Sequence, residues 1–590
     1  MRSIPFKRVG VSITLLVVAM LAAACAGQTL PPPPAATSAP AAATNAPAAT
    51  NAPAPTTAAA TNAPAATSAP AAGEKTLVYV TPTLALSLDP CVIPGQQTAE
   101  MIMNTSWFWT TYRQIDGPNG IKMDDTASGE DAIQPAASDS TTQQPGVLES
   151  WENSADGKVW TLHIRKGVKD SFGNELKAED AKWIWNRIKN FGPCTYIADA
   201  LGISDVEKQV KVIDDYTVQI TLEAPDPIFL RVLHVNNGMA LGPEARKHTT
   251  TDDPWAGAWT KENTAAIGPY MVESWQPGVQ MVLVKNPNWF GAKPDIDRII
   301  YRQVPEDSNR LALLVSGDAQ IARDLTQEEL DQVAQTPGLH VQCIAANQFL
   351  YATMPYKSGP TSNIKVRQAL AYAVPYDDIL KSVYAGRAGP MPGMTPPNYT
   401  DFLGADKWPY KTDYDMAKKL LAEGGFPNGF PMNVLVDTSV PEYERIAVLL
   451  KDSFSKIGVD LTIDLKPSAA YRDLEFSHKY DGMVFDQNYA ITLDPDYHSN
   501  VWLSPNPPPS FNAGEFTDEE FNKLQKQGFA MPAGPERTQV MHRIQEIFNE
   551  KLGYLSLGVP PTCYGMSDKV TDYHWHTHNQ LIFSDLKLAQ

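Results

Sequence analysis

The sequence lacks two short motifs of common hydrolases. Neither GxSxG, which marks a serine nucleophile on a sharp turn, nor HExxH, which places two zinc ligands on one helix face, occurs in the 590 residues. Asp494 and Asp496 could pass as a carboxylate pair, but Asp-Pro-Asp in a loop is more often turn chemistry. A surface-anchored hydrolase is therefore an alternative hypothesis and not the favoured one.

Positive charge and long apolar runs are also scarce. Lys and Arg number 48 against 66 Asp and Glu, which gives a formal net charge of −18. This balance argues against nucleic-acid binding and against a body that lies on anionic lipid. Beyond the N-terminal region, no stretch approaches eighteen consecutive apolar residues, so we expect a soluble body.

Cysteine is rare, with only five in the chain. One of them, Cys25, lies in the N-terminal region, and four others lie in the body: Cys91, Cys194, Cys343 and Cys563. An even number outside the cytoplasm suggests two disulfides with three possible pairings, although free buried thiols are the alternative. The spacings exclude a CxxC metal or redox site.

The N-terminus has the layout of a signal peptide. Arg2, Lys7 and Arg8 precede an almost uncharged apolar run that ends in three alanines before Cys25. The segment resembles a bacterial lipobox, with Ala22 in place of the usual leucine. The resemblance implies a signal peptide over residues 1–24 and a lipidated Cys25, whose acyl chains would anchor the protein. An ordinary signal peptide with an accidental cysteine is the alternative.

Residues 25–73 read as a tether. The segment TNAPAAT recurs at 44–50 and 61–67, and the region is almost entirely small residues and proline. Such a composition cannot bury enough apolar surface to offset its ordering entropy, so we expect it to be disordered. At about 3.1 Å per residue, residues 29–72 could reach roughly 130 Å at most, which suits a stalk that holds the body away from a membrane.

About 515 residues remain for the body, enough for two large domains or roughly three ordinary ones. Strand and helix patterns alternate along them, which predicts an α/β architecture with more than one sheet. A polar insertion is expected over 116–146, and Thr517 with Glu520 reads as a capping box. The expected strands are 76–80, 158–168, 216–222, 281–287, 297–304 and 459–465, and the expected helices are 178–191, 307–318, 363–374, 414–426, 441–457 and 534–552.

Four segments in this order resemble the family 5 extracellular solute-binding proteins of ABC importers. They begin with GVLESWENSADGKVWTLHIRKG (146–167, continuing to 188), followed by 267–322, 364–390 and YDGMVFDQNYAITLDPDYH (480–498). Two departures from the family pattern look structural. Lys177 replaces the usual threonine before Ala-Glu-Asp, and Pro375 replaces the usual aspartate after the Tyr-Ala-Val stretch.

The resemblance implies a two-lobed clam-shell of the type II periplasmic-binding kind (cluster C). Its first lobe would comprise residues 74–347 plus 556–590, with an extra subdomain at about 113–200, and its second lobe residues 348–555. The chain would cross between the lobes near 349–355 and 554–561. Since Cys343 and Cys563 flank these crossings, we expect the pairs Cys343–Cys563 and Cys91–Cys194.

The resemblance also points to ligand-binding residues in a cleft between the lobes. In peptide-binding relatives, an aspartate four residues before the proline of the acid-Pro pair compensates the ligand's ammonium. Here that position is Ile491, so either Asp486 or Asp494 supplies the charge or the ligand lacks a free α-amine. The expected ligand-binding residues are Trp107, Phe108, Trp109, Tyr112, Phe349, Tyr351, Asn488, Tyr489, Ile491 and Asp494.

The aromatic cluster at 104–112 mildly favours sugar ligands, with core packing as an equally weighted alternative. His574, His576 and His578 would share one face of a strand. No nearby carboxylate completes an obvious metal site, so we expect a hydrogen-bonded surface ladder, no metal and no cofactor.

The sequence therefore predicts a non-enzymatic substrate-binding lipoprotein of an ABC importer, anchored to the outer face of a bacterial membrane. Its ligand would be an oligopeptide or similar solute, with oligosaccharide or metal chelate as alternatives. The expected partner is the importer's permease, and the expected state is a monomer. A sensory receptor is a further alternative that the sequence does not separate from an importer component.

Overall fold

The computed structural model describes residues 73–91, 96–117, 120–123, 145–226, 228–234, 239–344, 347–490, 492–505, 510–576 and 578–589. Cys25, the tether and Ile491 lie outside these residues. Among the described residues, no helix has the length and apolar character needed to cross a membrane.

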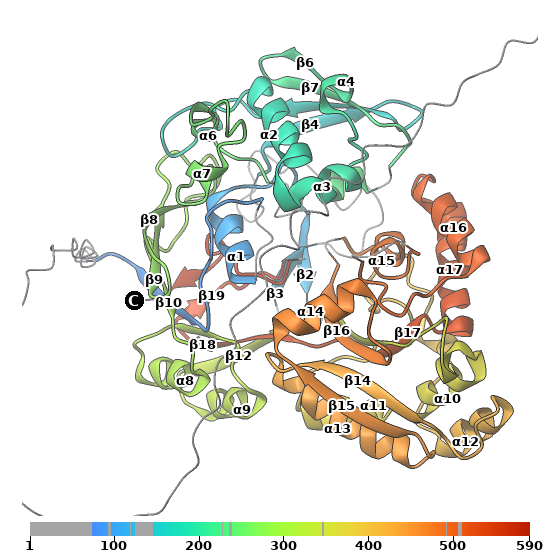
Figure 1. Cartoon of the computed structure of the whole chain (residues 1–590). Helices are drawn as coiled ribbons and strands as arrows, with labels where there is room; N and C mark the ends of the chain where they lie inside the picture. The colour runs from blue at the N-terminus through green and yellow to red at the C-terminus, as the bar shows by residue number, and fades with distance from the viewer. Residues whose placement is uncertain are drawn as a thin grey trace, which may run out of the picture. The chain divides into compact units, whose positions relative to one another are not determined.

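A seven-stranded mixed sheet is built from both ends of the described chain (Figure 1). Its central strand β1 pairs in parallel with β10 and β11, and β18, from near the C-terminus, lies antiparallel between β11 and β12. In order, the strands are β12 (Leu339–Ile344), β18 (Thr562–Ser567), β11 (Ile321–Arg323), β1 (Thr76–Thr81), β10 (Arg298–Gln303), β9 (Gln280–Lys285) and β8 (Tyr270–Gln276).

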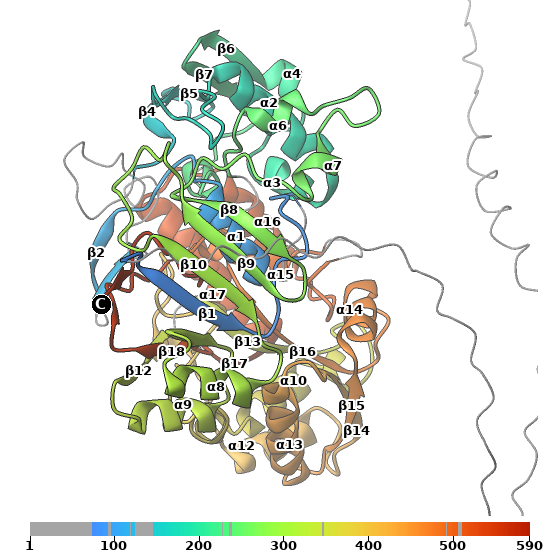
Figure 2. The same ribbon diagram turned by 90° about the vertical axis from the view of Figure 1, so that its left-hand side faces the viewer.

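A four-stranded antiparallel sheet follows within the same part of the chain (Figure 2). The alternation of Val159 to Ile164 places Trp160, Leu162 and Ile164 on a buried face, against which α2 packs. The strands are β4 (Leu148–Asn153), β5 (Val159–Ile164), β7 (Thr217–Thr221) and β6 (Val210–Asp214). The subdomain limit expected near residue 200 therefore falls short of β7.

A five-stranded mixed sheet carries the remaining large core. Its order is β15 (Asp460–Lys466), β14 (Pro431–Asp437), β16 (Met483–Tyr489), β13 (Gln348–Thr353) and β17 (Tyr554–Gly558). Here we name residues 73–344 and 562–589 the first lobe, and residues 347–558 the second lobe. Because β17 runs to Gly558, the lobe limit expected at residue 555 falls inside this strand.

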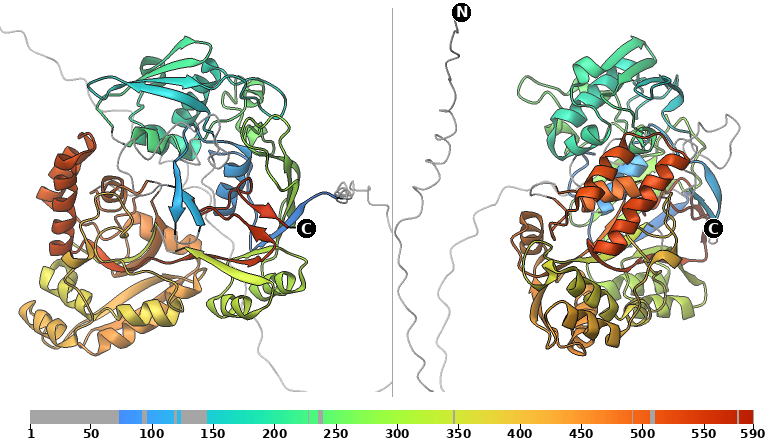
Figure 3. Two further views of the ribbon diagram at one scale, coloured as in Figure 1. Left: turned by 180° about the vertical axis from the view of Figure 1, so that it is seen from behind. Right: turned by 90° about the vertical axis from the view of Figure 1, so that its right-hand side faces the viewer.

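Helices cover these sheets, and two pairs of short strands complete the fold (Figures 1 and 3). In the first lobe the helices are α1 (Gln96–Thr105), α2 (Ala178–Asn190), α3 (Thr195–Ala200), α4 (Val206–Gln209), α5 (Phe229–Val232), α6 (Glu244–Lys247), α7 (Gly257–Thr260), α8 (Asp307–Ser316) and α9 (Gln327–Gln335). In the second lobe they are α10 (Ile364–Ala373), α11 (Tyr376–Asp378), α12 (Tyr414–Glu423), α13 (Pro441–Ser455), α14 (Ser468–Ser477), α15 (Pro495–Trp502), α16 (Glu519–Phe529) and α17 (Pro535–Lys551). The strand pairs are β2 (Gln114–Gly117) with β3 (Gly120–Met123), and β19 (Val570–Thr571) with β20 (Lys587–Leu588).

Most expected elements are present, and the exceptions have local causes. Helix α8 ends where expected, because Gly317 adopts a φ of 83° that suits a residue without a Cβ. The capping box expected from Thr517 and Glu520 is wrong. Asp518 is the N-cap of α16 and accepts a hydrogen bond from the Phe521 amide at 3.1 Å, while Glu520 pairs with Arg543.

The chain passes between the lobes twice, after β12 and after β17. One disulfide lies beside these passages, and the other lies elsewhere in the first lobe. Cys343 and Cys563 are directly paired residues of β12 and β18 and form one disulfide. The other joins Cys91 to Cys194, so the structure contains the same two pairs that the sequence suggested.

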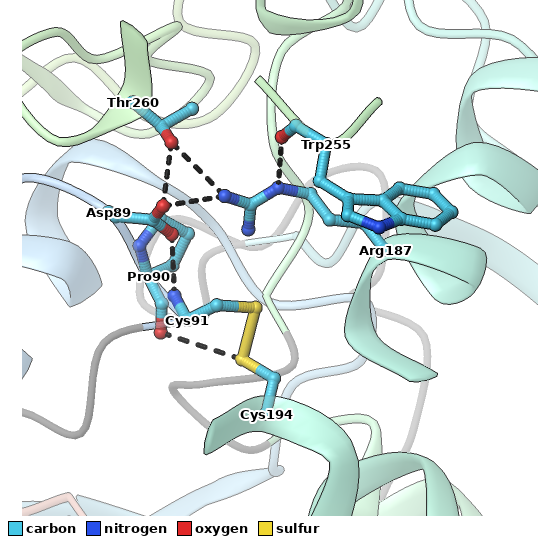
Figure 4. The surroundings of a disulfide bond; sticks show 7 residues. All are labelled: Asp89, Pro90, Cys91, Arg187, Cys194, Trp255 and Thr260. Carbon is cyan, nitrogen blue, oxygen red and sulfur yellow. Dashed lines mark hydrogen bonds and ion pairs between the residues drawn. A yellow bond between two sulfur atoms is a disulfide. The ribbon is translucent and has the colours of Figure 1, made fainter. Parts of the chain in front are cut away.

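The Cys91–Cys194 disulfide lies next to a buried ion pair (Figure 4). Asp89 accepts hydrogen bonds at 2.6 Å from both Arg187 Nη2 and Thr260 Oγ1, and at 2.8 Å from the Cys91 amide. Arg187 also donates from Nε to the Trp255 carbonyl at 2.8 Å. These bonds link α2, α7 and the loop after β1, which holds the extra four-stranded sheet against the rest of the first lobe.

Candidate functional site

The two lobes meet where α5 of the first lobe faces the start of α15 of the second. We name residues 226 and 228–234 the α5 turn, and residues 490 and 492–496 the α15 entry. Arg231 Nη1 of the α5 turn lies 3.9 Å from Asp494 Oδ2 of the α15 entry, and both side chains are 3% exposed. Tyr497, just beyond, packs against the cores of both lobes.

A second contact between the lobes lies beside a chain crossing. Asn579 Nδ2 donates to Asn347 Oδ1 at 2.6 Å, and Asn347 Nδ2 donates to the Ala490 carbonyl at 3.0 Å. Asn579 directly follows His578, whose Nε2 bonds to the His234 carbonyl of the α5 turn at 2.9 Å. The α5 turn and the α15 entry are therefore linked directly through Arg231 and Asp494, and indirectly through residues 578–579. We name the α5 turn, the α15 entry and residues 578–579 together the lobe junction.

Arg537 of α17 neutralises the α15 entry. Its guanidinium donates to both oxygens of Asp494, from Nη2 to Oδ1 at 2.8 Å and from Nη1 to Oδ2 at 3.1 Å. Burial alone raises the pKa of Asp494, but Arg537 more than reverses this effect and the pKa lies below its ordinary value. Asp494 also caps α15 through the Asp496 amide at 2.9 Å. Both side-chain oxygens of Asp494 therefore already accept hydrogen bonds from the protein itself.

Two further acids at the junction have side-chain oxygens without a hydrogen-bond partner. Asp226 of the α5 turn uses Oδ1 to accept from the Ile228 amide, while Oδ2 has no hydrogen-bond partner. Burial, followed by the charge of Asp494, raises the pKa of Asp226 to about 7. Asp496 is fully buried without a hydrogen bond to either side-chain oxygen, and burial raises its pKa well above the ordinary value.

The aromatic residues expected in the cleft are buried in the first lobe. Trp107 and Trp109 pack edge-on or tilted against Trp289 and Trp185, with ring centroids 4.7 and 5.0 Å apart. Phe108 instead stacks on His234 at 3.9 Å. Tyr112 meets the same imidazole edge-on at 4.8 Å. The cluster therefore divides into a core pair, Trp107 and Trp109, and a pair that borders the α5 turn.

Phe349 and Tyr351 of β13 lie in the core of the second lobe. They are at most 1% exposed, and Phe349 packs on His498 and Trp502. Their strand neighbours Asn488 and Tyr489 on β16 are half-buried. Ile491 lies outside the described residues.

Asp486, the other acid considered as a ligand counter-charge, is also engaged by the protein. It lies 3.2 Å from Arg472 Nη1 and 3.2 Å from the Tyr351 hydroxyl. Nearby Glu475 is buried beside Asp486, and burial followed by this like charge raises the pKa of Glu475 to about 9. Asp486 thus belongs to a buried network around Arg472.

The surface ladder expected from the three C-terminal histidines is wrong. His574, His576 and His578 lie outside any strand, and His576 and His578 are 4% and 0% exposed. The sequence also gave no sign of their carboxylate partner: Asp585 Oδ2 lies 2.8 Å from His576 Nε2 and 3.4 Å from His574 Nδ1. Among the described residues, no group of three or more His, Cys, Asp or Glu side chains is arranged to hold a metal ion.

Two surface hollows lie away from the junction. One, of about 1010 Å³, runs along edge strand β8 and is lined by residues 83–86, 261–264 and 271–275, among others. The other, of about 480 Å³, is lined by residues of the second lobe that include Tyr376, Trp408 and Tyr410. Neither lining includes a residue of the α5 turn or the α15 entry.

Comparisons with known proteins agree with this architecture. The model for bacterial extracellular solute-binding proteins, family 5 (middle region), matches residues 142–509. The chain is 26% identical over 421 residues to a probable D,D-dipeptide-binding periplasmic protein of Escherichia coli strain K12, covering 71% of this chain and 79% of that protein. It is 27% identical over 474 residues to heme-binding protein A of Haemophilus influenzae, covering 74% and 82%.

A solved structure gives the same result for the fold. The ABC transporter-associated periplasmic binding protein DppA from Helicobacter pylori, in complex with the peptide STSA, superposes with a TM-score of 0.71 at 22% identity. The match covers 88% of this chain and 98% of that one. The fold is thus the expected two-lobed type II periplasmic-binding architecture, and the chain belongs to family 5 of the bacterial extracellular solute-binding proteins of ABC importers.

Proposed function

We propose that this protein is the substrate-binding lipoprotein of an ABC importer, which captures an oligopeptide or similar small solute between its lobes and delivers it to the permease. The observation that carries the proposal is the lobe junction, where buried polar groups of both lobes face each other near the two chain crossings. A solute that touches both lobes stabilises the closed form by its differential affinity for that form.

A peptide is the favoured ligand because relatives are described as binding dipeptides and the peptide STSA. Asp494 and Asp486 already compensate Arg537 and Arg472, so neither supplies a spare negative charge. An unpaired ammonium in a closed cleft costs several kcal/mol. A free α-amine would therefore need Asp226 or Asp496, and solutes without one, including oligosaccharides, are the alternative class. A metal chelate is a third alternative.

The proposed cellular setting rests on the N-terminal sequence. Residues 1–24 would be removed, Cys25 would carry the lipid, and the tether to residue 73 would hold a monomeric body at the outer face of the bacterial membrane. The permease and the tethered body would then share one membrane, so the closed body would not have to diffuse through the bulk medium to reach the permease. We further propose that each lobe ends at the crossings, between residues 344 and 348 and between residues 558 and 562.

Hydrolysis is the competing function. The spacing Ser-x-x-Lys, used by some acyl-transfer enzymes, occurs at Ser362, Ser453 and Ser584. Ser453 Oγ donates to the Ala373 carbonyl at 2.5 Å, and Lys456 lies 2.8 Å from Asp452. Lys365 and Lys587 are likewise paired with acids, Glu423 and Asp572. None of these serines is thus activated by its lysine, which favours release of the solute unreacted.

A thermal-shift screen of the mature chain tests the proposal. The probes are dipeptides to tetrapeptides of alanine and phenylalanine, and maltose to maltotetraose. We expect one compound class to raise the melting temperature by several degrees, and mass spectrometry to recover it unchanged. Chemical conversion of a probe would favour a hydrolase, and the absence of any shift across both classes would contradict solute capture by this fold.

A further inference from the structure

Two buried imidazoles at the lobe junction have hydrogen-bonding capacity that the protein does not use. His234 is 1% exposed and His578 is 0% exposed, and the rings are stacked with centroids 5.8 Å apart. His234 Nε2 and His578 Nδ1 have no hydrogen-bond partner. A buried polar atom without a hydrogen-bond partner is energetically unfavourable, so two such atoms in neighbouring rings need an explanation.

The other nitrogen of each ring fixes its tautomer. His234 Nδ1 lies 2.7 Å from the Thr110 carbonyl, and His578 Nε2 lies 2.9 Å from the His234 carbonyl. A carbonyl only accepts, so these two nitrogens must carry the protons. Burial lowers the pKa of His234 well below its ordinary value and that of His578 to about 4, so both rings stay neutral at physiological pH. The remaining nitrogens are therefore bare acceptors.

These acceptors belong to segments that contact the second lobe. His234 belongs to the α5 turn, three residues after Arg231, which contacts Asp494 of the second lobe. His578 directly precedes Asn579, which contacts the second lobe through Asn347. On the opposite lobe, the Thr492 hydroxyl of the α15 entry is buried and has no hydrogen-bond partner either. Unused polar atoms of both lobes thus lie in segments that take part in these interlobe contacts.

The surroundings restrict what can bind there. Phe108 stacks on His234 with an interplanar angle of 10°, and Tyr112 meets the ring edge-on. Gln580, two residues after His578, is 1% exposed and both polar atoms of its amide lack partners. Aromatic rings thus border the imidazole of His234, and an apolar lining with few polar groups is typical of ligand sites.

We propose that His234 and His578 form a donor-recognition subsite, which accepts hydrogen bonds from N–H or O–H groups of the captured solute. This inference rests on the proposed function and adds a chemical requirement: the solute must present hydrogen-bond donors to two neutral imidazoles. Peptide amides and sugar hydroxyls share this chemistry, and the experiment separates them.

Two substitutions remove each acceptor while keeping the structural bond. In His234→Asn, the side-chain amide nitrogen replaces Nδ1 as the donor to Thr110. In His578→Gln, the amide nitrogen replaces Nε2 as the donor to His234. His340→Gln is the matched control, because this histidine is exposed and pairs with Asp568. All variants are compared with the wild-type mature chain by calorimetric titration of the tightest probe from the screen.

We expect each substitution to weaken binding about five- to tenfold, the worth of one net hydrogen bond, with little change in the melting temperature of the free protein. The control should bind like wild type. In ¹⁵N-histidine-labelled protein, the probe should shift the resonances of the bare His234 and His578 nitrogens. N-methylated peptide probes should lose affinity if the donors are amides, and deoxy-maltose analogues should lose affinity if they are hydroxyls.

The outcomes distinguish this subsite from the proposed function. If wild type binds a probe and both variants bind it equally well without a ¹⁵N shift, the subsite is wrong while solute capture stands. If the variants lose stability instead of affinity, the histidines are structural and the subsite is again wrong. A wild-type chain that binds no probe contradicts both.

Discussion

Two groups of buried polar side chains lie at the lobe junction, and they differ in how fully the protein uses them. Around Arg537, the carboxylate of Asp494 receives two hydrogen bonds from the guanidinium and one from the backbone. Around His234 and His578, each ring makes one bond and leaves its second nitrogen bare. The first group uses its polar atoms within the protein, whereas the second leaves two acceptors that we propose are completed by the captured solute.

Breaking the satisfied group should have the largest effect. Arg537→Met would leave the carboxylate of Asp494 buried without its main counter-charge, so we expect a loss of about 3–5 kcal/mol in unfolding free energy. Urea unfolding measures this loss. Arg543→Met on the same helix is the control: its pairs with Glu520 and Glu550 are largely exposed, and the loss should stay below about 1 kcal/mol. Equal losses in the two variants would mean that the buried network carries no special weight.

The second prediction concerns Asp226, whose Oδ2 has no hydrogen-bond partner although Asp494 and Arg537 lie close enough to affect its pKa. Its pKa is raised to about 7 from 3.8, so its contribution to stability is present below about pH 4 and is lost as the pH rises to about 7. Asp226→Asn should therefore be more stable than wild type at pH 8, by about 1–3 kcal/mol, with a difference that shrinks toward pH 4.

Thermal unfolding across pH 4–8 measures this difference. Asp156→Asn is the control, since a hydrogen bond from Ser154 chiefly lowers the pKa of that exposed carboxyl. A constant difference between Asp226→Asn and wild type over the whole range would show that Asp226 stays ionised in the folded protein.

Sequence patterns predicted the elements with a periodic apolar spacing. They missed short elements and contacts between residues far apart in the chain. Helices with several turns, such as α8 and α17, are indicated by the spacing of their apolar residues and by a terminal Gly or Pro. The α5 turn has only four helical residues, Phe229–Val232, too few for any periodicity. The His578–His234 bond joins residues 344 positions apart, which no local pattern encodes.

Other errors reflect choices between equivalent neighbours. Thr517 and Asp518 can both cap a helix, and tertiary packing selected Asp518. The pattern of alternating histidines was real, but its strand interpretation failed because Asp585 and the His234 carbonyl supply partners that hold these side chains inward. The resemblance to a family singled out residues 486–498, which contain the α15 entry, as a cleft wall, and this stays a prediction. The facing α5 turn became visible only in the structure.

The smallest expected effect concerns the contact between the lobes. Arg231→Leu removes the 3.9 Å approach to Asp494 while Arg537 still neutralises that acid. We expect probe affinity to fall several-fold with little loss of stability, because a contact between the lobes favours the form in which they are closed. Arg387→Leu is the control, since its pair with exposed Asp331 is also interlobe and should contribute less than about 1 kcal/mol. Equal affinities in both variants would place Arg231 outside the closing interface.

Distance measurement between the lobes tests the central claim most directly. Val279 in the first lobe and Val448 in the second are 54% and 53% exposed, so Val279→Cys and Val448→Cys give labelling sites for electron-spin distance measurements. The account predicts a broad or longer distance distribution in the free protein that narrows and shortens when the tightest probe is added. An identical distribution with and without a bound probe would contradict capture of a solute by closing lobes.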